Sequence, residues 1–409
     1  MKYIKLVLCF IVFLLPINIF AVSLIDTYSN VIVIYDMTDN KILFDKNGSG
    51  VKSIASLTKM MTAITAIEMI EKNPSIDLTS QVKVTNKMLN NVSSVASVAG
   101  LETGDVVTYE DLLYAMILPS GADASIVLAM SLSDNINSFV DEMNVLANKI
   151  GVENTHFVNT HGLDQENHYG TGDDVLKILI YSMKNETFKK VFTAKEYVLS
   201  NNLKVYSTIY KYNKLLNLDT SRILGSKTGY TGDAGTCMAT YFTSNGHEFL
   251  SITLGAKHSN EDSFHLRDSL NLIDFMDDNF NNQVLINGEK ITSIDVHWSN
   301  VSSVDIVSKE VKKYLPNDYD KSLFKYEYVG KEDIYPSFDK DEPIGKINYY
   351  YDNELFDSED VFVKDSIKFS FWTFFKAKIL YFIIAFIILF LIFNNIKKKK
   401  RKRKRKMYR

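Results

Sequence analysis

A serine and a lysine three residues apart could form a nucleophile and its base. Ser56 and Lys59 lie in a stretch that begins a helical pattern running to about Lys72. Residues at this spacing share one helix face, so the amine can reach the hydroxyl. A serine is a weak nucleophile until a base takes its proton, and a lysine can be that base when burial or a nearby cation lowers its pKa. The spacing alone is common, so the rest of the chain must support the chemistry.

Two further polar side chains stand where a ligand could approach. Ser120 lies in Pro-Ser-Gly, which predicts a tight turn between two apolar helices within residues 111–130. Such a turn can hold a hydroxyl in a cleft, although an ordinary helix connection shows the same pattern. Lys227 is expected on a strand at a sheet edge, where Gly225 and Gly229 would let a ligand backbone approach. A solvated strand end is the alternative interpretation.

The segment 155–174 is rich in histidine and could order a loop or bind a metal. It contains His161, Asp164 and His168. Their spacings match no standard ligand motif, and no thiolate is nearby. We therefore expect these three side chains to order the loop by hydrogen bonding rather than to hold a metal.

The elements that must position these residues follow an α+β order. Strands open and close the region, and helices fill its middle. We expect the first and last strands to share one antiparallel sheet. The strands are predicted at 30–36, 41–45, 195–200, 204–210, 234–244 and 247–255, and the helices at 56–72, 111–130 with a break, 135–150, 174–185 and 263–280.

The sequence pattern changes after the predicted catalytic domain, 24–282. Short alternating segments separated by polar, acidic stretches predict a small all-β domain over 283–366. The predicted strands are 284–286, 294–298, 304–307, 324–328 and 347–351. This domain carries no group of nucleophiles, and a spacer is the simplest role for it.

The N-terminus resembles a secretory signal peptide. Lys2 and Lys5 precede an apolar run over 6–20, and small residues follow. We expect a signal peptide over 1–23, with an uncleaved anchor as the alternative. Removal of this segment would leave Cys237 as a lone cysteine, which we expect to be a small buried hydrophobe.

The C-terminus predicts a membrane anchor. Residues 379–396 are almost purely apolar, and 18 helical residues span about 27 Å, enough for a bilayer core. The basic tail 397–409 would stay cytoplasmic, and the aromatic and basic segment 367–378 suits the opposite interface. A buried core helix with a disordered tail fits this length and flanking charge poorly. We therefore expect a single-pass protein of the cell membrane whose catalytic domain is extracellular.

The charge distribution excludes nucleic acid as a partner. Residues 397–409 hold 11 of the 46 Lys and Arg, so the rest of the chain carries 35 basic against 49 acidic side chains. The basic residues form a terminal run beside an apolar segment, whereas nucleic-acid binding needs a basic patch on a folded surface.

The three motifs occur together in an order that resembles a known family. Ser56-Leu-Thr-Lys59, Ser120-Gly-Ala122 and Lys227-Thr-Gly229 resemble the S-x-x-K, S-x-N and K-T-G set of penicillin-recognising serine enzymes. The chain resembles the low-molecular-mass penicillin-binding proteins, the D-alanyl-D-alanine carboxypeptidases of peptidase family S11. The resemblance implies their fold: an antiparallel sheet with helices on both faces and a helical subdomain, then a β domain and one C-terminal transmembrane helix.

The resemblance also implies a reaction in peptidoglycan biosynthesis. Ser56 would attack the terminal D-Ala-D-Ala bond of a stem peptide, and β-lactam antibiotics would acylate it as covalent inhibitors. Lys59 would take the proton of Ser56, kept neutral partly by the cation of Lys227. Ser120 would relay a proton toward the leaving amine. Neither a metal nor an organic cofactor is implied.

Substrate binding is implied for the strand that carries Lys227. Lys227 and Thr228 would hold the C-terminal carboxylate of the substrate, beside Gly229. The backbone amides of Ser56 and Tyr230 would form the oxyanion hole.

The sequence departs from the family pattern at two places. Ala122 stands where the family usually has Asn, so a side-chain amide is missing, and the carboxylate of Asp123 is expected to point elsewhere. Arg267 is not assigned to the carboxylate-binding role that an arginine often has in this family. A β-lactamase and a non-catalytic penicillin-binding sensor or scaffold remain alternatives. The β domain and the anchor favour the carboxypeptidase. Ala122, which lacks the usual amide, is the reason that the non-catalytic sensor remains an alternative.

Overall fold

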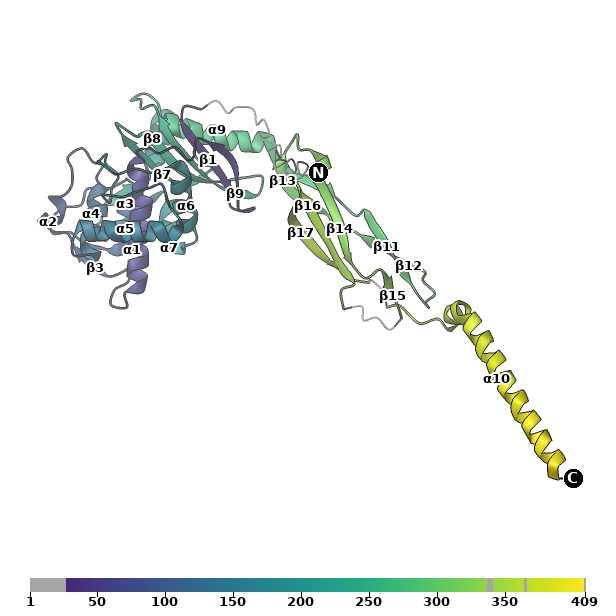
Figure 1. Ribbon diagram of the computed structural model, residues 1–409. Helices are drawn as coiled ribbons and strands as arrows, with labels where there is room; N and C mark the ends of the chain where they lie inside the picture. The colour runs from purple at the N-terminus through teal and green to yellow at the C-terminus, as the bar shows by residue number, and fades with distance from the viewer. Residues whose placement is uncertain (1–26, 337–340, 364–365, 408–409) are drawn as a thin grey trace, which may run out of the picture. The chain divides into compact units, whose positions relative to one another are not determined.

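The computed structural model describes residues 27–336, 341–363 and 366–407, and the chain divides into two compact units, Met1–Asp278 and Asn279–Arg409. The first unit contains a five-stranded antiparallel sheet in the order β2-β1-β9-β8-β7 (Figure 1). The predicted pairing of first and last strands is confirmed, because β1 lies beside β9. The strands are β1 (Val31–Asp36), β2 (Lys41–Lys46), β7 (Ile223–Thr231), β8 (Gly235–Ser244) and β9 (His247–Ala256).

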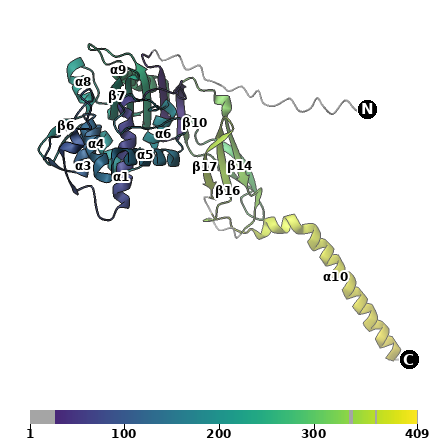
Figure 2. The same cartoon turned by 60° about the vertical axis from the view of Figure 1, so that its left-hand side comes forward.

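Helices cover both faces of this sheet, as Figures 1 and 2 show. The Val-Ile-Val-Ile run of β1 is wholly buried, which requires packing on both sides. Ala239 and Tyr241 of β8 share a core with α1 (Thr58–Lys72). Because neighbouring strand residues face opposite sides, Thr240 faces α9 (Phe264–Asn279), where its hydroxyl lies 3.1 Å from that of Ser269. The predicted α+β organisation is confirmed.

The remaining helices form the middle of the first unit, and α3, α4, α5 and α6 lie where the sequence predicts helices, whereas α2, α7 and α8 were not predicted. The break within 111–130 separates α3 from α4, and Gly151 ends α5 with a φ of +83°. The helices are α2 (Asn86–Leu89), α3 (Tyr109–Ile117), α4 (Ala122–Leu132), α5 (Ile136–Ile150), α6 (Gly172–Met183), α7 (Glu186–Thr193) and α8 (Thr208–Leu216). β3 (Gln81–Lys83) and β4 (Val106–Thr108) form a small antiparallel pair, and β5 (Glu196–Val198) and β6 (Lys204–Tyr206) form a hairpin.

The strand predicted over 204–210 is too long. It ends at Tyr206, and Thr208 begins α8. The amide of Ser207 closes the β5–β6 hairpin on the carbonyl of Lys195, and the amide of Thr208 then donates to Leu118. The rings of Tyr206 and Tyr210 stack at 5.6 Å. These contacts override a β-rich local sequence.

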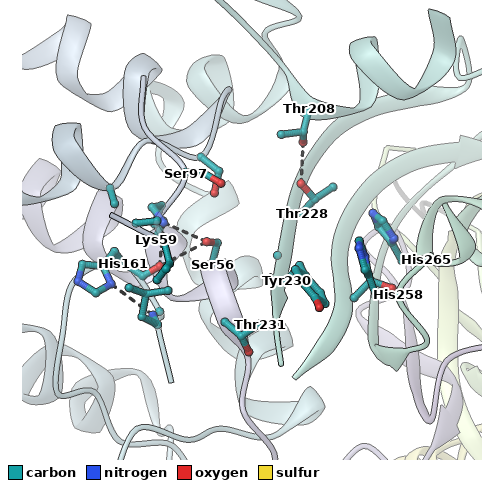
Figure 3. A pocket seen from close by; sticks show the side chains of 18 of the residues that line it. Ser56, Lys59, Ser97, His161, Thr208, Thr228, Tyr230, Thr231, His258 and His265 are labelled. Atoms are coloured by element: carbon teal, nitrogen blue, oxygen red, sulfur yellow. Dashed lines mark hydrogen bonds between the residues drawn. The ribbon is translucent and has the colours of Figure 1, made fainter. Parts of the chain in front are cut away.

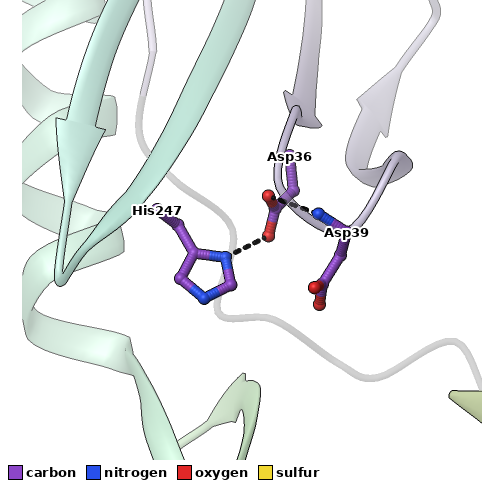
Figure 4. A group of neighbouring side chains, drawn as sticks. All are labelled: Asp36, Asp39 and His247. Atoms are coloured by element: carbon purple, nitrogen blue, oxygen red, sulfur yellow. Dashed lines mark hydrogen bonds and ion pairs between the residues drawn. The ribbon is translucent and has the colours of Figure 1, made fainter. Parts of the chain in front are cut away.

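A buried carboxylate and a histidine link the ends of two neighbouring inner strands, β1 and β9 (Figure 4). Asp36, at the end of β1, lies 2.9 Å from Nδ1 of His247 at the start of β9. Asp36 also accepts hydrogen bonds from the backbone amides of Thr38 and Asp39. Asp36, Asp39 and His247 are the one trio of possible metal-ligand residues found among the described residues. Because Asp36 already accepts these bonds, we interpret the trio as a cap of the β1–β2 turn.

The described residues of the second unit form three small sheets. β10 (Phe280–Ile286) pairs with β13 (Val311–Pro316), β11 (Lys290–Val296) lies between β12 (Ser303–Val307) and β15 (Asp333–Ile334), and β16 (Gly345–Tyr351) lies between β14 (Phe324–Gly330) and β17 (Glu354–Val361). A short 3₁₀ turn, η2 (Lys321–Leu323), precedes β14. The all-β prediction is confirmed, but β13, β15 and β17 were not predicted. β17 is an acidic edge strand whose apolar residues do not alternate regularly, so its sequence carries little strand signal.

The C-terminal segment is one helix, α10 (Phe371–Met407), which also includes much of the aromatic segment and the basic tail. Its part Phe371–Lys402 is long and apolar enough to cross a membrane, with a mean hydropathy of 2.6. The predicted C-terminal transmembrane helix is therefore supported by length and composition. The predicted signal peptide lies outside the described residues.

Candidate active site

Ser56 lies at the entrance to the central helix, beside the predicted lysine. It belongs to a 3₁₀ turn, η1 (Ala55–Leu57), immediately before α1. Its Oγ accepts a hydrogen bond from Nζ of Lys59 at 3.0 Å (Figure 3). The same amine donates to the carbonyl of His161 at 2.7 Å. Ala55 has a φ of +47°, a left-handed conformation that costs an alanine on the order of 1 kcal/mol. The turn before the serine is therefore strained.

Two glycines let other backbone segments come close to this turn. A Cβ on Gly229 of β7 would lie 2.8 Å from the amide nitrogen of Ser56. Gly162 has a φ of +85°, and a Cβ there would lie 1.9 Å from the carbonyl oxygen of Ala55. Gly229 therefore makes room for the serine turn itself. The expected ligand-approach role of Gly225 is wrong, because the space beside it is filled by Phe192, 2.8 Å from its Cβ position.

Burial changes the protonation of Lys59. The side chain is 2% exposed, and desolvation lowers its pKa to about 7. The negative charge of Asp123 acts in the opposite direction and raises it. A lysine with this pKa is partly neutral near pH 7, so it can accept a proton from a hydrogen-bonded hydroxyl.

A second buried lysine approaches from the sheet. Nζ of Lys227 donates to Oγ of Ser120 at 2.8 Å and to the carbonyl of Thr228 at 2.7 Å. Lys227 is 0% exposed, so it is not a solvated strand end. Burial lowers its pKa, and the charge of Lys59 lowers it further. Ser120 is held at a φ of +66° in the predicted turn between α3 and α4.

The turn that carries Ser120 is anchored by an acid. Both carboxylate oxygens of Asp123 accept backbone hydrogen bonds, from Ala99 at 2.8 Å and from Gly100 at 2.8 Å and Leu101 at 3.0 Å. The expectation that this carboxylate points away from the site is confirmed. Ala122 lines the cavity, and its amide donates to the carbonyl of Ser97.

The predicted residues surround one cavity of about 260 Å³. Figure 3 shows Ser56 and Lys59 on one side and the β7 residues Thr228 and Tyr230 on the other. Ser120 and Gly229 also line it, and Lys227 reaches its wall through Ser120. The structure therefore brings all seven predicted site residues together.

Several lining residues were not predicted. Thr208, at the start of α8, has its hydroxyl 2.7 Å from that of Thr228, and the ring of His258 stacks on Tyr230 at 4.1 Å. Ser97 and His265 also line the cavity. No motif marks these positions, because they come from segments that only the fold brings to β7. Arg267 is paired with Asp262 at 2.6 Å and is not among the lining residues.

The histidine-rich segment orders the loop beside Lys59. Asn159 accepts hydrogen bonds from the amides of His161 and Gly162, at 3.2 and 2.7 Å. His168 lies 2.9 Å from the hydroxyl of Thr58 and accepts from the amide of Val158. Burial lowers the pKa of both His161 and His168 to about 4, so both are neutral at pH 7.

Asp164 completes this network, accepting from the hydroxyls of Ser53 at 2.5 Å and Thr231 at 2.8 Å. Nδ1 of His161 accepts from the amide of Leu163 at 3.3 Å, so the expectation of loop-ordering hydrogen bonds is confirmed for His161, Asp164 and His168.

Comparisons with known proteins agree with this arrangement. A sequence profile of the peptidase S11 family, described as D-alanyl-D-alanine carboxypeptidase, matches residues 19–258. The chain is 25% identical over 342 residues to the D-alanyl-D-alanine carboxypeptidase DacF of Bacillus subtilis. This alignment covers 82% of this chain and 85% of that protein. It is 31% identical over 225 residues to the D-alanyl-D-alanine carboxypeptidase of Streptomyces sp. strain K15, which covers 52% of this chain and 76% of that protein.

Solved structures of similar fold include two penicillin-binding proteins. Penicillin-binding protein 5 from Haemophilus influenzae has a TM-score of 0.60 at 24% identity and covers 84% of this chain and 98% of its own. PBP3 from Streptococcus pneumoniae has a TM-score of 0.63 at 19% identity and covers 84% of this chain and 100% of its own. The expected penicillin-binding-protein fold is confirmed by these neighbours. Because the family profile spans more than half of the chain, this protein belongs to the D-alanyl-D-alanine carboxypeptidases, serine-type hydrolases of peptidase family S11.

Proposed function

We propose that this protein removes the terminal D-alanine from peptidoglycan stem pentapeptides through an acyl-enzyme on Ser56. Oγ of Ser56 attacks the carbonyl carbon of the D-Ala-D-Ala bond while its proton passes to Nζ of Lys59. The C–N bond then breaks, and the leaving amine takes up a proton and departs as D-alanine. Water hydrolyses the resulting ester and restores the hydroxyl. The observation that carries this proposal is the 3.0 Å contact between Ser56 and a buried Lys59 inside the cavity.

The two buried lysines suggest how the substrate prepares the base. Each amine has a lowered pKa through burial, and the charge of Lys59 further lowers the pKa of Lys227. A substrate carboxylate beside Lys227 favours the protonated form of Lys227. The resulting cation then favours the neutral form of Lys59. Binding of the anionic end of the substrate therefore assigns the proton to Lys227 and leaves Lys59 ready to accept another.

The residues of β7 supply binding and transition-state stabilisation in this proposal. Lys227 and Thr228 hold the carboxylate, with Thr208 supporting the hydroxyl of Thr228. The backbone amides of Ser56 and Tyr230 receive the developing oxyanion, and such a donor is typically worth about 3–4 kcal/mol. Gly229 lets β7 come close to the turn that carries Ser56, since a Cβ at position 229 would lie 2.8 Å from the amide nitrogen of Ser56. Ser120, bonded to Lys227, relays a proton toward the leaving amine.

We further propose that the enzyme works on the outer face of the cell membrane. Residues 1–23 act as a signal peptide, and 379–396 span the bilayer within α10. The basic residues after 396 remain cytoplasmic. The same site would be acylated by β-lactam antibiotics.

Release of D-alanine from a synthetic pentapeptide by the detergent-solubilised full chain tests this function. We expect release by the native protein and none by Ser56→Ala. A protein that binds fluorescent penicillin but releases no D-alanine would favour a penicillin-binding sensor, an alternative that Ala122 supports. A penicillin adduct that hydrolyses within seconds, without D-alanine release, would favour a β-lactamase.

A further inference from the structure

Aromatic side chains gather where the β strands of the second unit meet α10. The segment after β11 forms an isolated antiparallel bridge between Ser299 and Phe369. The amide of Ser370 donates to the carbonyl of Trp298 at 2.7 Å. The segment leading into α10 is therefore hydrogen-bonded to the β domain just before the helix begins.

Trp298 contacts both the β domain and the helix. Its ring lies edge-on to Tyr335 at 5.0 Å and to Phe374 of α10 at 5.1 Å. Nζ of Lys378 lies 5.9 Å from the same ring. Trp298 has a φ of +53°, which is unfavourable for a bulky residue. The structure keeps this strained conformation, and these contacts offset its cost.

Large aromatic surfaces on this junction and on the first turn of α10 remain exposed. Tyr335 is 45% exposed, Phe369 54%, Phe371 61% and Trp372 70%. We refer to these four residues and Trp298 as the aromatic patch. A patch of this kind on a folded surface indicates a binding surface.

The charges and the position of the patch indicate its partner. Between residues 366 and 380 the chain has three lysines, Lys368, Lys376 and Lys378, and no acidic residue. Tryptophan and tyrosine beside lysines favour the headgroup layer of a bilayer, whose anionic lipids attract the lysines. Two residues of the patch, Phe371 and Trp372, are also the first residues of the membrane-spanning candidate Phe371–Lys402.

We propose that the aromatic patch binds the phospholipid headgroup layer, so that the β domain itself contacts the membrane through Trp298 and Tyr335. This inference rests on the proposed membrane anchoring by α10. It assigns the β domain a role beyond that of a spacer. Contacts from both the β domain and the helix would restrain how the domain sits on the bilayer.

The chain holds two tryptophans, Trp298 and Trp372, which makes the test direct. The full chain is reconstituted into vesicles of phosphatidylglycerol and phosphatidylethanolamine that carry a bromine-labelled lipid. Trp372→Phe leaves Trp298 as the only tryptophan reporter, and Trp298→Phe leaves Trp372. We expect bromines near the headgroup to quench both reporters, and bromines at the acyl-chain ends to quench them less.

The outcomes separate the new inference from the anchoring on which it rests. Quenching of Trp372 without quenching of Trp298 would overturn the β-domain contact and leave the anchor intact. Quenching of neither tryptophan would overturn both. Double substitution of Tyr335 and Phe369 by serine should reduce the quenching of Trp298. The matched change Tyr326→Ser, at a 42% exposed tyrosine on β14, should leave the quenching unchanged. Equal effects of the two substitutions would contradict the patch.

Discussion

The lysines of the catalytic cavity are buried, whereas several lysines of the β domain are exposed and paired with acids. Lys59 and Lys227 are 2% and 0% exposed and contact hydroxyls and carbonyls. In the β domain, Lys290 and Lys309 are exposed and paired with Asp305 and Asp357 at 2.7 and 2.8 Å. Exposed pairs contribute about 0–1 kcal/mol and are tolerated at many surface positions. Buried amines oppose folding when charged, so two such lysines beside one cavity indicate a functional site.

Strained backbone conformations also mark the functional regions of the chain. Among the described residues, the positive-φ residues other than Gly, Asn and Asp are Ala55, Ser120 and Trp298. The first two lie at the cavity, and the third lies at the proposed membrane contact. The strain therefore accompanies the two places where the chain must present a group in a fixed direction.

Exchange of a buried and an exposed lysine for methionine should show the largest difference. We expect Lys59→Met to slow acylation by penicillin by about 10³-fold, because the general base is lost. The unfolding midpoint should not fall, since a costly buried amine is removed. Lys290→Met should leave acylation unchanged and alter the free energy of unfolding by less than about 0.5 kcal/mol. Stopped-flow acylation and thermal unfolding would measure both. Similar acylation rates for the two variants would remove the basis of the comparison.

Two glycines near the end of β7 test the close approach to the nucleophile. Gly229→Ala places a Cβ 2.8 Å from the amide of Ser56, so β7 must shift. We expect acylation to fall about 10²-fold, the scale of a 1 Å misplacement. No atom of the described residues lies within 4 Å of the position that a Cβ on Gly232 would take, and Gly232→Ala should react normally. Equal rates would show that the spacing between β7 and Ser56 is not critical.

The pH dependence of acylation should report the buried base. Lys59 accepts a proton only when neutral, and burial lowers its pKa to about 7. The rate constant for penicillin should therefore rise about tenfold per pH unit below this pKa and level off above it. A bound carboxylate that keeps Lys227 charged would lower the pKa of Lys59 further and move the inflection of the pH–rate profile to lower pH. A rate that rises only near pH 10 would show that Lys59 has an ordinary lysine pKa.

The pair Thr208 and Thr228 should have the smallest effect. Thr208→Val removes the hydroxyl 2.7 Å from that of Thr228. We expect KM for the pentapeptide to rise severalfold, with little change in kcat, because the pair orients a binding group. Thr243→Val, on an exposed position of β8, serves as the control. A fall in kcat with unchanged KM would place Thr208 in the chemical step instead.

The sequence predicts much of the site because its residues lie in local motifs. The turn at Ser120 follows from Pro-Ser-Gly, and the edge position of Lys227 follows from the strand order. Thr208 and His258 could not be predicted in the same way. They reach the cavity through the packing of α8 and the segment after β9, which no short pattern specifies.

The fold could likewise be predicted where local sequence patterns are clear. Apolar periodicity identifies α1, and the apolar run of β1 marks a buried strand. β17 is acidic and partly exposed at a sheet edge, so its pairing with β16 depends on tertiary context. The role of Gly225 was misjudged because Phe192, distant in sequence, fills the adjoining space.

Mass spectrometry of the penicillin-treated chain tests the central claim most directly. The full-length protein is treated with penicillin, digested, and searched for the covalent adduct. We predict an adduct on the peptide that contains Ser56, absent in Ser56→Ala and still present in Ser293→Ala, a control serine in the β domain. An adduct on Ser120, or an adduct that persists in Ser56→Ala, would contradict the assignment of Ser56 as the nucleophile.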